Sequence, residues 1–92
     1  MRIRWTRGAV ADLAEIGEFI ERENFAAAGR VLQSICDQVR LLANQPILGR
    51  PGRTEGTREL VHVRYPYIVA YRVHNEDIEI LAVRHTARRW PN

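Results

Sequence analysis

The sequence predicts an α+β fold in which an N-terminal helical hairpin packs on one face of a small antiparallel sheet, in the order β-α-α-β-β-β. Two observations support this prediction. Apolar residues recur at helical spacing through most of residues 7–44, and after a segment rich in glycine and proline they alternate as in strands. Ninety-two residues are enough for one modest core and too few for two, so we expect a single domain over residues 1–92.

The first two elements are a short strand and a helix. Residues 2–5, RIRW, alternate polar and apolar side chains. Thr6 is a typical N-cap, and a helix is predicted over roughly residues 7–23. Its predicted apolar stripe consists of Val10, Leu13, Ile16, Phe19 and Ile20, and its predicted solvated face carries Asp12, Glu15, Glu18 and Glu21.

A second helix is predicted to begin after Asn24, which can cap it, and to run antiparallel to the first because the connection is short. Its stripe contains Val31, Leu32, Ile35, Val39 and Leu42. The stripe stops near Asn44, and Pro46 ends the helix. Cys36 lies beside the stripe and is expected to be a small buried apolar residue rather than a reactive thiol.

Residues 46–57, PILGRPGRTEGT, hold three of the six glycines and two of the four prolines, and a loop is predicted there. The periodicity then becomes that of strands at 58–63, 67–73 and 78–84. The middle run is apolar on both faces, so it is expected to lie in the centre of the sheet. Ile78, Ile80 and Ala82 alternate with Glu79, which predicts one wetter face.

Composition narrows the class of protein. The charge is +3, and all fourteen positive side chains are arginine. Arginine pairs bidentately with phosphate or carboxylate, so a nucleic acid or an acidic protein is a suitable partner, although genomic base composition explains the bias equally well. No apolar run is long enough to span a membrane, and the N-terminal stretch MRIRWTRGAV has charge but no apolar run behind it, so it is not expected to be a signal peptide. The single cysteine indicates a reducing, bacterial cytoplasmic setting.

Three stretches, PILGRPGRTEGTREL, YPYIVAYRV and ILAVRHTARRWP, together with the order of elements, resemble the RelE/ParE toxin superfamily of bacterial type II toxin–antitoxin systems. The match covers nearly the whole chain. The resemblance implies a toxin without cofactor or metal, held inactive in a hetero-oligomer by a cognate antitoxin. That antitoxin has an acidic C-terminal segment and a DNA-binding N-terminal domain, through which alone the complex reaches operator DNA.

The superfamily has two main activities. RelE-like members cleave messenger RNA on the ribosome, whereas ParE-like members inhibit DNA gyrase and are not known to catalyse a reaction. If this chain is a nuclease, the resemblance assigns the catalytic residues to Arg84, His85, Arg50 and Arg53. Arginine is a poor proton shuttle because it stays protonated.

Other positions disfavour catalysis. Residues 46–49 contain no carboxylate, and Glu55 falls several positions late for a general base. Ile68 stands where the nucleases carry a cation before the strand tyrosine, here Tyr71. We therefore expect a ParE-like toxin that contacts DNA gyrase. The alternatives are a ribosome-dependent mRNA endonuclease and a degenerate, non-toxic homologue that only binds its antitoxin.

Two sets of binding residues follow from this interpretation. Carboxylates of the antitoxin are expected to pair with arginines on the sheet, and the antitoxin-binding set is Arg58, Arg72, Arg84 and Tyr71. The candidates for binding the target lie in the tail and are His85, Arg88, Arg89 and Trp90. Trp90 is also expected to pack against the domain. No role is assigned to His62 or His74.

Overall fold

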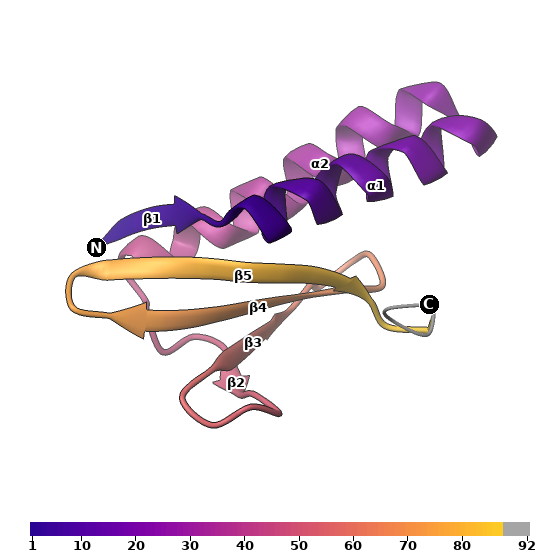
Figure 1. Ribbon diagram of the computed structural model, residues 1–92. Helices are drawn as coiled ribbons and strands as arrows, with labels where there is room; N and C mark the ends of the chain where they lie inside the picture. Colours follow the sequence, from indigo (N-terminus) through magenta and orange to yellow (C-terminus); the bar gives the residue numbers. More distant parts are fainter. Residues whose placement is uncertain (88–92) are drawn as a thin grey trace.

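The computed structural model describes residues 1–87, and it has the predicted order of helices and strands with two short additions (Figure 1). The additions are a 3₁₀ turn and a two-residue strand in the predicted loop. The elements are β1 (Arg2–Trp5), α1 (Arg7–Glu23), α2 (Phe25–Arg40), η1 (Leu41–Ala43), β2 (Arg50–Pro51), β3 (Arg58–Val61), β4 (Tyr67–His74) and β5 (Asp77–His85). Arg88, Arg89 and Trp90 lie outside the described residues.

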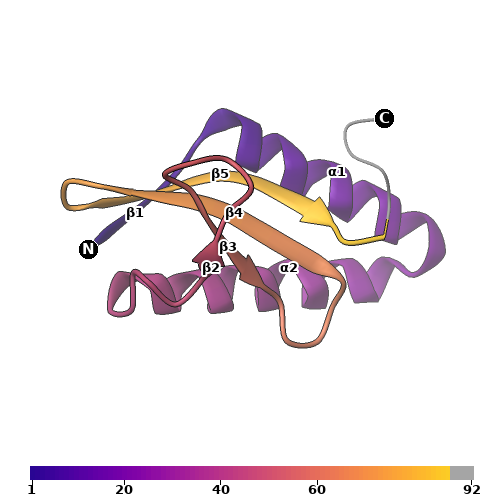
Figure 2. The same ribbon diagram turned by 90° about the horizontal axis from the view of Figure 1, so that it is seen from below.

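The five strands form one sheet in the order β1-β5-β4-β3-β2. The prediction of an antiparallel meander is confirmed for β3, β4 and β5, and β4 is central as expected. β1 instead lies parallel to β5, so the sheet is mixed. The reason is topological, because parallel strands need a long crossover connection and the helical hairpin begins that connection. Both helices cover the same face of the sheet (Figures 1 and 2).

Both predicted helix caps are present. Thr6 Oγ1 accepts a hydrogen bond from the Ala9 amide at 3.2 Å and donates one to the Ile80 carbonyl at 2.8 Å. Asn24 Oδ1 accepts a hydrogen bond from the Ala27 amide at 3.1 Å. Thr6 therefore fixes the start of α1 to strand β5, whereas Asn24 satisfies the start of α2 alone.

The buried face of α1 differs from the predicted stripe. Ala9, Ile16 and Gly17 are buried, whereas Val10 and Phe19 are 53% and 42% exposed. A Cβ on Gly17 would lie 3.1 Å from Leu32 Cδ1, so the two helices approach each other closely there. Of the predicted stripe, Ile16 is buried and Leu13 and Ile20 pack partly buried against the core, whereas the prediction that Val10 and Phe19 are core residues was wrong.

Asp12 was predicted to be solvated, but its carboxylate accepts a hydrogen bond from the Val83 amide at 2.9 Å. Burial raises the pKa of this carboxyl group. β1 pairs with β5 only as far as Ile80, and beyond that point Thr6 and Asp12 of the helical segment bond the exposed edge of β5.

A β-bulge changes the alternation predicted for β5. Ala70 pairs with Ala82 and Tyr71 with Ile80, which leaves Leu81 as the additional residue. Val83 therefore takes the place predicted for Ala82 and is fully buried with Ile78 and Ile80. The bulge explains why strict period-two alternation gave the wrong residue.

The core joins the helices to the central strands. Its buried cluster comprises Ala9, Ile16, Val31, Ile35, Val39, Leu42, Leu60, Tyr67, Val69, Tyr71, Ile78, Ile80 and Val83. α2 ends at Arg40, earlier than predicted, and η1 continues the chain so that Leu42 still enters this core. Within residues 1–87 no helix is long and apolar enough to cross a membrane.

Replacing the two cap residues is expected to give unequal losses of stability. Asn24→Ala removes a cap and is expected to lower the free energy of unfolding by about 1 kcal/mol. Thr6→Val removes a cap and the bond to the Ile80 carbonyl, so a loss of about 2 kcal/mol is expected. Urea unfolding of both variants checks this, and equal losses would contradict the role of Thr6 in joining α1 to β5.

The ion pair between β1 and β5 is expected to make stability depend on acid pH. The hydrogen bond from Arg2 holds the pKa of Asp77 below its ordinary value. The resulting stabilisation is fully present above about pH 4 and is lost as pH falls through the lowered pKa. Asp77→Asn should therefore lose less stability than the wild type between about pH 4 and pH 2. Circular dichroism during acid titration measures this, and identical profiles would refute it.

Candidate functional site

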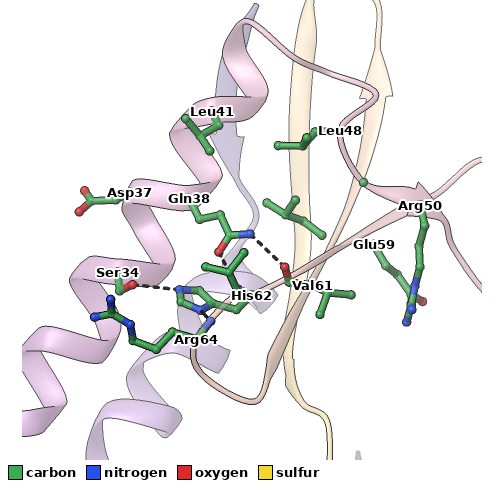
Figure 3. Close-up of a pocket in the computed structure, with 13 residues that line it drawn as sticks. Ser34, Asp37, Gln38, Leu41, Leu48, Arg50, Glu59, Val61, His62 and Arg64 are labelled. Atoms are coloured by element: carbon green, nitrogen blue, oxygen red, sulfur yellow. Dashed lines mark hydrogen bonds and ion pairs between the residues drawn. The ribbon is translucent and has the colours of Figure 1, made fainter.

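A groove lies between α2, strand β3 and the loop that precedes β2 (Figure 3). Its volume is about 800 Å³. Four apolar side chains on its walls are 43–90% exposed: Leu41, Leu48, Val61 and Val63. Apolar side chains clustered in an open groove are typical of a surface that binds another protein.

Two hydrogen-bonded side chains of α2 connect this helix to β3 across the groove. The Gln38 amide nitrogen donates to the Val61 carbonyl at 3.0 Å, and Ser34 Oγ lies 3.0 Å from His62 Nε2 (Figure 3). His62 Nδ1 also accepts hydrogen bonds from the amides of Arg64 and Tyr65, both at 3.0 Å. Sequence reasoning assigned His62 no role, and the structure shows that it holds the β3–β4 turn against α2.

The Ser34–His62 pair resembles a nucleophile and its base, but the proton is in the wrong place. Because Nδ1 accepts two amide hydrogen bonds, the neutral ring carries its proton on Nε2. Nε2 therefore donates to Ser34 and cannot take its proton, as nucleophilic catalysis requires. The pair is structural.

The other wall of the groove is held by Tyr71 and Arg58, two residues of the predicted antitoxin-binding set. Tyr71 is fully buried, and its hydroxyl donates to the Pro46 carbonyl at 2.9 Å and accepts from the Gly49 amide at 2.8 Å. Arg58 Nε donates to the Gly49 carbonyl at 2.9 Å. A Cβ on Gly49 would lie 2.7 Å from the Tyr71 ring, so only glycine fits. Tyr71 and Arg58 thus fix the backbone of residues 46–49, from which the Leu48 side chain extends into the groove.

The sheet face opposite the helices has a smaller pocket of about 200 Å³. Arg53, Arg72 and Arg84 line it, together with Glu59. Glu59 is only 4% exposed, and it accepts hydrogen bonds from the Arg50 side chain at 3.2 Å and from the Arg53 amide at 3.3 Å. Arg72 bonds Glu79 through two nitrogens at 3.0 and 2.9 Å. Most of these arginines are therefore neutralised within the domain.

The four residues expected to be catalytic in a nuclease, Arg50, Arg53, Arg84 and His85, do not lie together in one site. Arg53 and Arg84 share the small pocket, whereas Arg50 lines the large groove. His85 follows Arg84 in the same strand, so the two side chains point to opposite faces of the sheet. The His85 ring instead packs edge-on against Tyr67, with centroids 5.3 Å apart, and its Nδ1 accepts a hydrogen bond from the Ala87 amide at 3.0 Å.

The neighbour of Arg84 is also informative. Ile68 pairs directly with Arg84 in the β4–β5 register, so the aliphatic residue lies where a second cation was sought. Among residues 1–87 no group of three His, Cys, Asp or Glu side chains is placed to hold a metal ion. Cys36 is half-buried, and burial raises the pKa of its thiol, which keeps it protonated and unreactive near neutral pH.

Comparison with known proteins gives the family. A family model described as the ParE toxin of type II toxin–antitoxin systems, parDE, matches residues 3–90. The protein Y4kP of Sinorhizobium fredii is 49% identical over 90 residues, which cover 98% of this chain and 93% of that protein. Toxin RelE2 of Caulobacter vibrioides is 36% identical over 87 residues, which cover 95% and 97% of the two chains.

Two solved structures are similar throughout. A chain of the chromosomal ParDE system of P. aeruginosa has a TM-score of 0.85 and 35% identity, with 92% of this chain and 95% of that chain covered. A chain of the toxin–antitoxin complex RelBE2 of Mycobacterium tuberculosis has a TM-score of 0.67 and 27% identity, with 91% and 95% covered. Both are described as toxin–antitoxin assemblies. With its mixed sheet, helical hairpin and matching sequence, the chain belongs to the ParE toxin family of type II toxin–antitoxin systems.

Proposed function

We propose that this toxin stops growth by inhibiting DNA gyrase through protein–protein contact, in the bacterial cytoplasm, and that a cognate antitoxin neutralises it by occupying the groove between α2 and β3. The observation that supports a non-catalytic action is the surroundings of Arg84. Its register partner is Ile68, and the adjacent His85 points to the other face of the sheet.

Metal-independent cleavage of RNA needs a base for the 2′-hydroxyl, cations for the phosphorane and an acid for the leaving oxygen. Within residues 1–87 the small pocket supplies cations and one carboxylate, Glu59. That carboxylate is already engaged with Arg50 and Arg53, and no imidazole lines the pocket. These contacts favour binding over proton transfer.

The large groove is the proposed place for the antitoxin because four exposed apolar side chains, Leu41, Leu48, Val61 and Val63, line it together. Its charged residues also favour an acidic partner. Asp37 pairs with Arg40 at 2.6 Å and Glu59 pairs with Arg50 at 3.2 Å. Arg64 lines the same groove and has no carboxylate partner within the described part of the chain.

The four residues predicted to bind the antitoxin have different roles in this proposal. Tyr71 and Arg58 position the groove wall through their bonds to residues 46–49. Arg72 and Arg84 lie on the opposite sheet face, where carboxylates of a partner that wraps around the sheet can pair with them. Operator DNA is contacted only through the antitoxin.

A second candidate function is ribosome-dependent cleavage of mRNA. It is favoured by the small pocket, which brings Arg53 and Arg84 to the same place as a buried carboxylate, and by the relative named toxin RelE2. In that case Glu59 is the base and Arg84 binds the phosphate. The two functions predict different targets.

Purified toxin is expected to inhibit DNA supercoiling by gyrase and to leave translated messages uncut. Arg84→Gln is expected to change gyrase inhibition by less than about threefold, because Arg84 lines the small pocket and is not among the residues expected to bind the target. Supercoiling assays beside primer extension on translated messages check this. Codon-specific cuts that disappear in Glu59→Gln and Arg84→Gln would establish the nuclease instead, and expression without growth arrest would identify a non-toxic homologue.

A charge placed in the groove is expected to weaken antitoxin binding. Leu41→Glu introduces a carboxylate into the apolar wall, and we expect affinity for the antitoxin encoded beside the toxin gene to fall at least about tenfold. Val10→Glu is the matched control, because Val10 is a helical residue of α1 that is 53% exposed, against 47% for Leu41, and does not line the groove. Calorimetric titration measures both. Equal affinities for the two variants would place the antitoxin elsewhere.

A further inference from the structure

Strand β3 has an open edge inside the groove. β2 pairs with β3 only at Arg58 and Glu59, and beyond them no strand of the described chain covers this side. The His62 amide donates to the Tyr67 carbonyl, so the even-numbered residues here direct their backbone groups towards β4. The backbone carbonyl of Val61, the last residue of β3, therefore points outwards as in an edge strand. The amide of Val63, two residues beyond β3, is directed to the same side, where Gln38 bonds it.

One side chain bonds this edge. Gln38 of α2 donates from its amide nitrogen to the Val61 carbonyl at 3.0 Å, and its amide oxygen accepts from the Val63 amide at 3.4 Å (Figure 3). A parallel neighbouring strand would make the same two bonds, with residues two apart, through the N–H and C=O of a single residue. The Gln38 amide thus occupies the place of one residue of a missing strand.

We propose that Gln38 is a displaceable substitute for a strand, and that an extended segment of the antitoxin runs parallel to β3. This segment bonds the Val61 carbonyl at the end of the strand and the Val63 amide just beyond it, and so takes both bonds from Gln38. This inference rests on the proposed function, because it assumes that the antitoxin occupies the groove. It adds the conformation of the bound segment, the backbone groups that it pairs with, and a residue that regulates access to them.

The contacts at the edge suit such an exchange. The bond to Val63 is long, at 3.4 Å, and the glutamine side chain gains rotamer freedom when it is released. Val63 is 90% exposed and Val61 43% exposed, so their side chains are ready to be covered by the incoming strand. Pairing to an open edge supplies affinity through the main chain, while pockets for alternate side chains supply selectivity.

The chemistry of the groove specifies the occupant. Leu41 and Leu48 are exposed in the groove and suit apolar side chains that alternate along the bound segment. Arg64 lies at the turn that follows β3 and has no carboxylate partner among residues 1–87. A segment with alternating apolar residues and a carboxylate at one end satisfies all three. This composition distinguishes an acidic antitoxin segment from a second copy of the basic toxin.

The proposal is tested by whether replacing Gln38 raises or lowers the affinity of the toxin for the antitoxin. Gln38→Ala removes the competitor for the edge, so the variant is expected to bind the neighbouring-gene antitoxin about 3- to 10-fold more tightly than the wild type. If Gln38 is instead an ordinary contact residue, affinity falls. Gln33→Ala is the matched control, because Gln33 is on the same helix, bonds Asp37 and does not line the groove; its affinity should be unchanged.

Hydrogen exchange gives a second measurement that does not depend on the variant. The Val63 amide should exchange at least about tenfold more slowly in the wild-type complex than in the free toxin. Unchanged or weaker binding by Gln38→Ala, or unprotected Val63 in the complex, overturns the inference while the proposed function stands. Failure of the wild-type toxin to bind the antitoxin overturns both, and dimerisation of Gln38→Ala in sedimentation would identify a second copy as the occupant.

Discussion

The fold depends on satisfying the backbone groups at the two edges of a sheet whose edge strands are too short. β1 covers only part of β5, and β2 covers only part of β3. Unpaired backbone groups that are shielded from water are costly, so other parts of the chain must bond them. The helical hairpin does this from both sides, with Thr6 and Asp12 on β5 and Gln38 on β3. The same side chains therefore fix the helices to the sheet.

The two edges differ in how firmly they are closed. On β5, three hydrogen bonds of 2.8–3.1 Å join the strand to the start of α1. The hydroxyl and the backbone amide of Thr6 both donate to the Ile80 carbonyl, and the Val83 amide donates to Asp12. On β3, a single flexible side chain makes one bond of 3.0 Å and one of 3.4 Å, beside an apolar groove. The first edge is part of the core, whereas the second is open to a partner. The surface proposed to bind the antitoxin thus lies where the sheet edge has the weaker hydrogen bonds.

Local features of the sequence predicted most of the fold. Thr6 and Asn24 cap the helices as expected, since a cap depends on residues only three positions away. Features that depend on distant residues were not predictable: the parallel pairing of β1 with β5, the bulge at Leu81, and the hydrogen bond from the Val83 amide to Asp12. For the site, the sequence indicated Arg53 and Arg84, which do share a pocket. It gave no indication of Gln38 or His62, because their roles depend on packing between α2 and β3.

The position of β5 has a consequence during synthesis of the protein. This last strand lies between β1 and β4, so the first strand has no neighbour in the sheet until residues 77–85 have left the ribosome. Domains fold as units once their sequence is available. A nascent chain that lacks β5 also lacks the strand on which Thr6 and Asp12 close the edge. The fold is therefore completed only after nearly the whole chain has been made, and a copy that ends before residue 77 cannot form this sheet.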